Sequence, residues 1–244
     1  MRRHIAFASL YNFRDAGGYR AADGRSVRWG QLYRSDSLGK LDGGDWERFR
    51  QLHVGTVIDL RHRHEIVARG RVPASDLLRY HHISVEHRPY DQAGLSAAVD
   101  PARFLADRYG ELAADGAAEF RRVLQLIAEA GPAPLVVHCA AGKDRTGVLT
   151  ALVLALLGVA QDDIVADYAL TGLVTDRLIA EWRADNGGKT PRWPGFGQAP
   201  AEAMRLFLAD LAAAHGSVRG YAAGPAGVDD GLVEALRGQL LSPR

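Results

Sequence analysis

The chain contains 244 residues, of which 47% are hydrophobic and 24% charged, and its formal net charge is +1. Such a near-neutral chain has no overall attraction for nucleic acid or for an acidic membrane surface, so any anion site must be local. Its single cysteine, Cys139, excludes an intramolecular disulfide and a zinc cluster of thiolates, and it fits a reducing cytoplasm. No stretch approaches the roughly 18 apolar residues of a membrane-spanning helix, so we expect no stable membrane insertion.

The first half of the chain predicts strands that alternate with helices. "RWGQLYRS" indicates a strand near residues 31–34. "DGGDWERFRQL" predicts a helix, because Trp46, Phe49 and Leu52 recur at helical spacing. "VGTVIDLR" predicts a buried strand that ends at residues 59–61, and "RYHHISV" predicts a further strand.

The second half begins with the same alternation and then becomes helical. We expect helices over residues 101–114 and 117–130, then a short apolar strand, "APLVVHC", and a central helix, "RTGVLTALVLALLG". The remaining chain predicts helices interrupted by the Gly- and Pro-rich loop "ADNGGKTPRWPGFGQAP". This order favours an α/β fold in which a central, mostly parallel sheet is flanked by helices and followed by a helical C-terminal part.

Residues 138–147, "HCAAGKDRTG", join the last apolar strand to the central helix and carry the clearest chemical signal. Gly142 permits the backbone angles of a tightly curled loop, and such a loop turns its N–H groups inward. The helix that begins near Arg145 adds its free N–H groups and the positive end of its dipole. We therefore expect an anion cradle suited to a phosphate, at the carboxyl end of a strand where α/β sheets bind ligands.

Cys139 lies within this cradle. The helix terminus and nearby cations favour its thiolate, a nucleophile that needs no separate base. Arg145 offers a planar fork for two phosphate oxygens, and Thr146 places a hydroxyl beside the thiolate. Most buried cysteines are only small hydrophobes, but such a residue needs none of the surrounding glycine and positive charge. A nucleotide-binding Walker loop is excluded because Asp144, rather than Ser or Thr, follows the Gly-Lys pair.

The pattern of Cys, five residues and Arg, preceded by His and followed by Thr-Gly, resembles the signature of the cysteine-dependent protein tyrosine phosphatases. The full string resembles the bacterial and fungal branch of that family. Weaker segments in the expected order extend the resemblance over most of the chain, namely "NFRDAGGY" (12–19), "LYRSDSL" (32–38), "VIDLR" (57–61), "IVADYALT" (164–171) and "GSVRGY" (216–221). The resemblance implies one tyrosine-phosphatase-like domain over residues 1–244, with residues 172–215 as a helical lid over the active site.

The resemblance also implies two-step hydrolysis through a phosphocysteine on Cys139, without metal or other cofactor, and with His138 orienting the loop. The implied catalytic residues are Cys139, Arg145 and Asp144. The implied substrate-binding residues are Ala140, Ala141, Gly142, Lys143, Thr146 and Gly147.

The identity of the general acid is open, because the chain has no Trp-Pro-Asp segment of the kind that supplies it in many tyrosine phosphatases. Asp144, inside the loop, is favoured. The alternatives are Glu86 and Asp91, which follow the strand "RYHHISV". Asp144 would in that case only brace the loop through a hydrogen bond.

Expected partners are phosphorylated proteins or peptides, with phosphotyrosine extended to phosphoserine and phosphothreonine, and no nucleic acid. Lys143 adds charge at the loop rim, which suggests phosphoinositides as further substrates, although a solvated lysine is the simpler interpretation. Two other functions compete. One is a catalytically silent phosphate-binding module of the same fold. The other is a sulfurtransferase, against which the Lys-Asp-Arg-Thr-Gly run argues.

Three further groups of residues have two interpretations each. The histidines of residues 61–65 and 81–87 could bind a metal, although loops rich in histidine are common. Arg14 and Asp15 are expected to form a structural ion pair that holds the N-terminal segment, rather than to act in catalysis. The basic cluster of Arg61, Arg63, Arg69 and Arg71 either steers phosphorylated substrates or forms a solvated loop.

Overall fold

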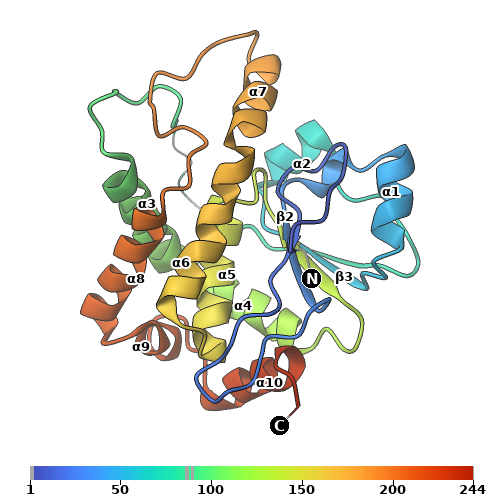
Figure 1. Ribbon diagram of the computed structural model, residues 1–244, viewed down its shortest axis with the longest axis vertical. Helices are drawn as coiled ribbons and strands as arrows, with labels where there is room; N and C mark the ends of the chain where they lie inside the picture. Colours follow the sequence, from blue (N-terminus) through green and yellow to red (C-terminus); the bar gives the residue numbers. More distant parts are fainter. Residues whose placement is uncertain (1–2, 86–87, 89–90, 244) are drawn as a thin grey trace.

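A computed structural model describes residues 3–85, 88 and 91–243, and five strands within this part of the chain form one sheet (Figure 1). The strands are β1 (Arg14–Asp15), β2 (Leu32–Ser35), β3 (Thr56–Asp59), β4 (Arg79–His82) and β5 (Leu135–His138). Their order across the sheet is β1-β2-β5-β3-β4, with β1 antiparallel to β2 and the other four parallel to one another. The prediction of a mostly parallel central sheet is confirmed.

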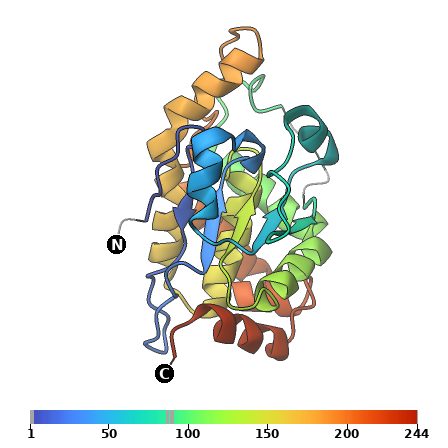
Figure 2. The same cartoon turned by 90° about the vertical axis from the view of Figure 1, so that its right-hand side faces the viewer.

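Helices cover both faces of this sheet (Figures 1 and 2). They are α1 (Gly43–Arg50), α2 (Arg63–Arg69), α3 (Pro101–Asp115), α4 (Ala117–Ala128), α5 (Asp144–Leu157), α6 (Gln161–Ala169), α7 (Thr175–Asp185), α8 (Ala201–His215), α9 (Val218–Ala223) and α10 (Asp230–Leu240), with 3-10 turns η1 (Leu38–Lys40) and η2 (Leu170–Val174). Each strand and helix expected from the sequence is present within a few residues of its predicted position. Among the described residues, no helix is both long and apolar enough to cross a membrane.

Alternating side chains of the central strands build two separate hydrophobic cores. Leu135 and Val137 of β5 and Ile58 of β3 belong to the larger core, whereas Val136 and Val57 belong to the smaller one. Because successive side chains of a strand point to opposite faces, each strand contributes to both cores. This explains why β3 and β5 appear in the sequence as uninterrupted apolar runs.

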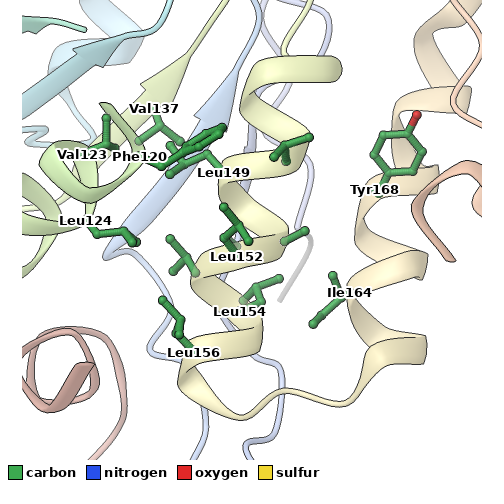
Figure 3. Packing of buried hydrophobic residues seen from close by; sticks show 14 of the residues in the cluster. Phe120, Val123, Leu124, Val137, Leu149, Leu152, Leu154, Leu156, Ile164 and Tyr168 are labelled. Atoms are coloured by element: carbon green, nitrogen blue, oxygen red, sulfur yellow. The ribbon is translucent and has the colours of Figure 1, made fainter. Parts of the chain in front are cut away.

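Helix α5 runs through the middle of the larger core and is buried on almost every side. Figure 3 shows its residues Leu149, Leu152 and Leu154 between Phe120 of α4 and Ile164 of α6. A helix that is apolar all round belongs in the interior, which agrees with its sequence. Such dense packing fixes the position of the first turn of α5.

The carboxyl ends of three parallel strands meet directly beside Cys139. His138, the last residue of β5, is paired in register with Ser35 of β2 and with Asp59 of β3. Cys139 follows immediately and is 2% exposed. The site predicted from the sequence therefore lies at the carboxyl edge of the sheet, on its central strand.

Candidate active site

The loop between β5 and α5 turns sharply at Gly142, whose φ is +65°. A Cβ atom at this position would lie 2.5 Å from the carbonyl oxygen of Ser35, so the backbone of β2 occupies the space that any other side chain needs. Both the left-handed φ and this close approach require glycine. The expectation that Gly142 permits the curl of the loop is confirmed.

Three successive carbonyl oxygens of the loop accept hydrogen bonds from groups outside it. The donors are Ser37 N to Ala140 O (3.0 Å), Asn12 Nδ2 to Ala141 O (2.9 Å) and Arg34 NH2 to Gly142 O (2.8 Å). In a trans peptide the C=O and N–H bonds point in opposite directions. The N–H groups of the following residues 141–143 are therefore directed away from these donors, toward the inside of the loop, which is the arrangement of an anion-binding nest.

Arg145, in the first turn of α5, is held by Glu65 of α2. Its two terminal nitrogens donate to the two oxygens of that carboxylate, at 2.5 and 2.9 Å. Glu65 also accepts the backbone N–H of His62 at 2.7 Å, which closes the capping box of α2. Burial raises the pKa of Glu65, but the hydrogen bonds and charge of Arg145 outweigh it and leave the pKa below its usual value.

Glu65 was not among the predicted site residues. The segment "RHRHE" suggests a metal site or part of a basic cluster, and neither interpretation predicts an ion pair between Glu65 and Arg145. The signal that could have identified it is its position, because a glutamate in the first turn of a helix that follows β3 lies beside the end of β5. No group of three or more His, Cys, Asp or Glu side chains suited to a metal ion occurs within the described ranges.

Asp144 is the first residue of α5 and its carboxylate has two partners. Tyr109 Oη of α3 donates to Asp144 Oδ1 at 2.7 Å, and Lys143 Nζ lies 2.9 Å from the same oxygen. The hydroxyl of Tyr109 is also 2.7 Å from that of Tyr168. Burial, followed by the nearby charge of Asp144, raises the pKa of Tyr168 well above its usual value, so this hydroxyl stays protonated.

The two alternatives to Asp144 as the general acid are Asp91 and Glu86. Asp91 lines the same cleft as Asp144, but it is exposed and its Oδ1 accepts the backbone N–H groups of Ala93 and Gly94 at 2.9 and 3.2 Å. Its carboxylate therefore closes a local turn. Glu86 lies outside the described residues.

His138 is completely buried beside the loop. Its Nδ1 is 3.3 Å from the carbonyl oxygen of Cys139 and its Nε2 is 3.5 Å from Asp59 Oδ2. Burial lowers the pKa of His138 although the charge of Asp59 opposes the shift. A neutral His138 that contacts the loop from the protein interior fits a structural role.

The cleft in front of the loop has two lobes, of about 370 and 340 Å³. Ala140, Asp144, Trp182 of α7 and Phe196 line both lobes, and the ring centroids of Trp182 and Phe196 are 4.9 Å apart. Arg145 faces the first lobe and Lys143 the second. The two aromatic rings therefore pack together and form part of the wall that the two lobes share.

Residues 172–215, predicted as a lid, divide into parts with different packing. Helix α8 packs against α3 and buries Met204 and Phe207 completely, so it belongs to the core. Trp193, in the loop before it, is also buried and donates its Nε1–H to Val99 O at 2.9 Å. Within this range, Trp182 and Phe196 are side chains that reach the cleft.

Two other expectations need correction. Arg14 pairs with Asp167 of α6 rather than with Asp15, whose carboxylate instead accepts the N–H groups of Gly17 and Gly30. Lys143 is 2% exposed, so it is not a solvated residue on the rim.

The basic cluster does not act as a single surface. Arg61 is buried and paired with Asp59, whereas Arg69 pairs with Glu181 and Asp185 of α7. Arg63 and Arg71 are exposed.

Gly147 is the fourth residue of α5. A Cβ there would be 3.1 Å from the ring of Tyr168. Its absence lets α6 pack closely against α5. Thr146 is completely buried, and its Oγ1 has no hydrogen-bond partner within the part of the chain that the structure describes.

The site combines a cysteine at the end of the central parallel strand, a nest of backbone N–H groups and an arginine in the first turn of the next helix. This is the arrangement that the sequence leads us to expect of a cysteine-dependent phosphatase. The model of the tyrosine phosphatase family matches residues 5–242, and the chain belongs to this family. It is a protein-tyrosine phosphatase that hydrolyses phosphorylated substrates, rather than a silent phosphate-binding module.

Two relatives identified by sequence agree with this assignment. The chain is 34% identical to a candidate tyrosine-protein phosphatase of Cupriavidus necator, over 96% of this chain and 85% of that protein. It is 28% identical to the triple specificity protein phosphatase PtpB of Mycobacterium tuberculosis, over 95% and 96% of the two chains. Among solved structures, the catalytic core of Siw14 matches with a TM-score of 0.38 and 13% identity, over 84% and 87% of the chains.

Proposed function

We propose that Cys139 is the nucleophile, that Arg145 binds two oxygens of the transferred phosphoryl group, and that Asp144 is the general acid. The observation that supports the proposal is the outward anchoring of the carbonyls of residues 140–142, which directs the next N–H groups toward the inside of the loop that begins at Cys139. Substrate contacts are proposed for Ala140, Ala141, Gly142, Lys143, Thr146 and Gly147. For Gly147 the contribution is indirect, through the packing of α6.

In the first step, the thiolate of Cys139 attacks phosphorus, so that an S–P bond forms as the P–O bond to the leaving group breaks. Asp144 gives its proton to the leaving oxygen. The N–H groups of the loop and the start of α5 stabilise the charge on the equatorial oxygens. Arg145, oriented by Glu65, adds a planar donor to the same oxygens.

In the second step, water attacks phosphorus, the S–P bond breaks and Cys139 leaves as the thiolate. The Asp144 carboxylate accepts the proton of the attacking water, which restores the starting state and balances the two steps. Thr146 supports this step, because its buried hydroxyl is available to donate to the departing sulfur.

The test is phosphate release from a phosphotyrosine peptide without added metal, by the wild-type chain and by Cys139→Ser. Activity of the wild type alone is expected. Activity in both proteins would exclude Cys139 as the nucleophile.

Asp144→Asn and Asp91→Asn then separate the two described candidates for the acid. Asp144→Asn is expected to lower kcat with phosphotyrosine by about a hundredfold, within the range of general acid catalysis. The proposal for Asp144 fails if only Asp91→Asn has this effect.

We propose a broad substrate range of phosphotyrosine, phosphoserine and phosphothreonine, supported by the name of the mycobacterial relative, a triple specificity phosphatase. Phosphoinositides are a further proposed class, supported by the place of Lys143 among the residues that line the second lobe. Lys143→Ala should then reduce phosphoinositide turnover more than phosphotyrosine turnover, and equal losses would exclude this class.

We also propose a reducing cytoplasm as the working compartment, since the lone thiol must stay reduced.

A further inference from the structure

The cations of the phosphate loop are already matched by carboxylates. Lys143 lies 2.9 Å from Asp144, and Arg145 forms its paired contact with Glu65. With both carboxylates ionised, these pairs leave no net positive charge beside the loop, and with Asp144 protonated as the proposed acid they leave one, against a thiolate and a phosphate dianion. The loop N–H groups and the start of α5 supply part of the compensation, and behind the loop the structure contains an unbalanced set of buried charges that can supply more.

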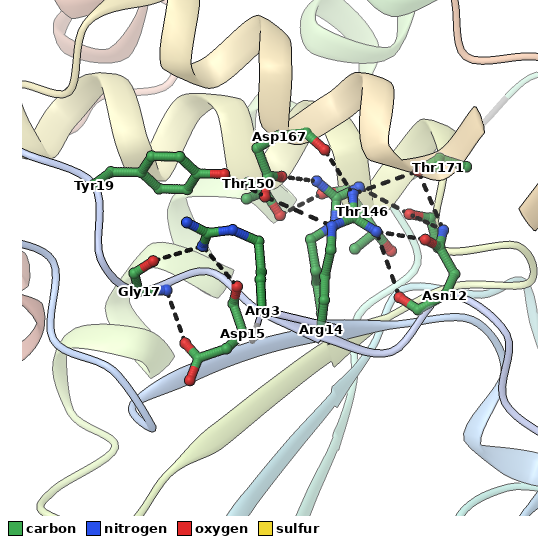
Figure 4. A network of polar contacts seen from close by, with 12 residues as sticks. Arg3, Asn12, Arg14, Asp15, Gly17, Tyr19, Thr146, Thr150, Asp167 and Thr171 are labelled. Atoms are coloured by element: carbon green, nitrogen blue, oxygen red, sulfur yellow. Dashed lines mark hydrogen bonds and ion pairs between the residues drawn. The ribbon is translucent and has the colours of Figure 1, made fainter. Parts of the chain in front are cut away.

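Arg14, Arg34 and Asp167, which we call the rear cluster, lie behind the loop and are each 1% exposed. Arg34 NH1 is 2.6 Å from Asp167 Oδ2, and Arg14 Nε is 3.6 Å from Asp167 Oδ1. Within the described chain, Asp167 is the one carboxylate paired with either arginine. In Figure 4 the guanidinium group of Arg14 lies between Asp167 on one side and Asn12 on the other.

With two arginines and one aspartate, the rear cluster therefore has a net charge of +1, and this charge is buried away from solvent. Burial and then the charge of Arg34 lower the pKa of Arg14 to about 10, and at that value Arg14 is still charged at neutral pH. An unbalanced buried charge is destabilising unless another charge compensates it. A bound anion on the far side of the loop provides that compensation.

Both arginines are connected to the loop carbonyls. Arg34 NH2 donates to Gly142 O at 2.8 Å. Arg14 donates to the side-chain oxygen of Asn12, whose Nδ2 donates in turn to Ala141 O and Gly142 O at 2.9 and 3.2 Å. A cation that binds a carbonyl oxygen polarises its peptide and makes the N–H on the other side a stronger donor.

We propose that Arg14 and Arg34 are positioning residues whose excess charge, acting through the peptides of residues 141–143, increases the affinity of the loop for a phosphate oxyanion. This inference rests on the proposed function, because it requires that the loop binds phosphate. A purely structural role would instead depend on the hydrogen bonds of the two guanidinium groups and not on their charge.

Three variants separate charge from structure. Arg34→Met removes the charge, Arg34→Lys keeps the charge but loses the planar fork, and Tyr19→Phe removes the 3.1 Å hydrogen bond to Asp167 without changing any charge. The measured quantity is the Kd of inorganic phosphate for the full chain, from calorimetry, together with kcat and KM for a phosphotyrosine peptide. Circular dichroism and thermal unfolding identify variants that do not fold.

We expect Arg34→Met to weaken phosphate binding at least tenfold and to raise KM, while Arg34→Lys stays within about threefold of the wild type and Tyr19→Phe within about twofold, as expected when charge dominates. The inference would be overturned if Arg34→Met and Arg34→Lys weakened phosphate binding equally, or if Arg34→Met left the Kd of phosphate unchanged. If Arg34→Met does not fold, Asp167→Asn decides, because removal of the negative charge should tighten phosphate binding, whereas a structural role predicts weaker binding. Failure of the wild type itself to bind phosphate would count against the proposed function instead.

Discussion

The Glu65 carboxylate of α2 and the Arg145 guanidinium of α5 meet in a two-point contact across the candidate active site. One carboxylate thus closes the helix capping box of α2 and fixes the orientation of the arginine proposed to bind phosphate. Arginine has many rotamers, and fixing one of them before substrate binds removes an entropic penalty from the binding step.

Glu65→Gln should therefore lower kcat/KM for a phosphotyrosine peptide by roughly ten- to a hundredfold, because hydrogen bonds to charged groups contribute about 1.5–3 kcal/mol. The amide keeps the shape of the side chain but accepts only one of the two bonds. Steady-state kinetics give the measurement. Glu47→Gln is the matched control, since Glu47 also pairs with an arginine but on exposed α1. Equal kinetics for Glu65→Gln and the control would show that Arg145 needs no carboxylate.

The curl of the loop gives a second prediction. Gly142→Ala should lower kcat/KM at least tenfold and destabilise the fold by more than about 1–2 kcal/mol, because it adds a clash with the Ser35 backbone to the cost of a left-handed φ. Gly187 has nearly the same φ, +64°, but no atom lies within 4 Å of its added Cβ. Urea unfolding and kinetics of both variants separate the steric effect from the backbone effect. Similar losses in Gly187→Ala would contradict the argument.

The hydroxyl of Tyr109 leads to a third prediction, about the proposed acid. Tyr109→Phe removes the 2.7 Å hydrogen bond to Asp144, so we expect kcat with phosphotyrosine to fall about tenfold, part of what an oriented general acid contributes. With p-nitrophenyl phosphate, whose leaving group needs little protonation, the fall should be much smaller. Tyr221→Phe is the control, because its buried hydroxyl donates to Ala113 O of the same helix, α3, and not to Asp144. Equal losses on both substrates would remove Asp144 orientation as the explanation.

The sequence predicts those parts of the site that are continuous in the chain. β5, Cys139, Gly142 and Arg145 follow one another within a few residues, and hydrophobic patterning, glycine and the helix start act locally there. The element order also predicts the sheet, because alternating strands and helices allow few topologies.

The partners of the loop could not be predicted in the same way. Asn12, Arg34, Glu65 and Asp167 come from four distant segments and meet only through tertiary packing. The expected pairing of Arg14 with Asp15 was wrong for the same reason. Neighbours along a strand point to opposite faces, so Arg14 turns toward α6 while Asp15 accepts N–H groups of the chain near Gly30.

Buried His138 gives a prediction about pH and stability. Its pKa is lowered by burial, so between its folded pKa and its ordinary value of 6.5 the unfolded chain binds a proton that the folded chain does not. The stabilisation is therefore complete above pH 6.5 and is lost as the pH falls below it, with a slope of at most about 1.4 kcal/mol per pH unit for one proton. His138→Gln should flatten the decline in unfolding free energy between pH 7.5 and pH 5.5, measured by urea titration. His215→Gln, at an exposed position, should keep the wild-type slope. A His138→Gln variant whose slope equals that of the wild type would mean that His138 takes up its proton in the folded protein as readily as in the unfolded chain.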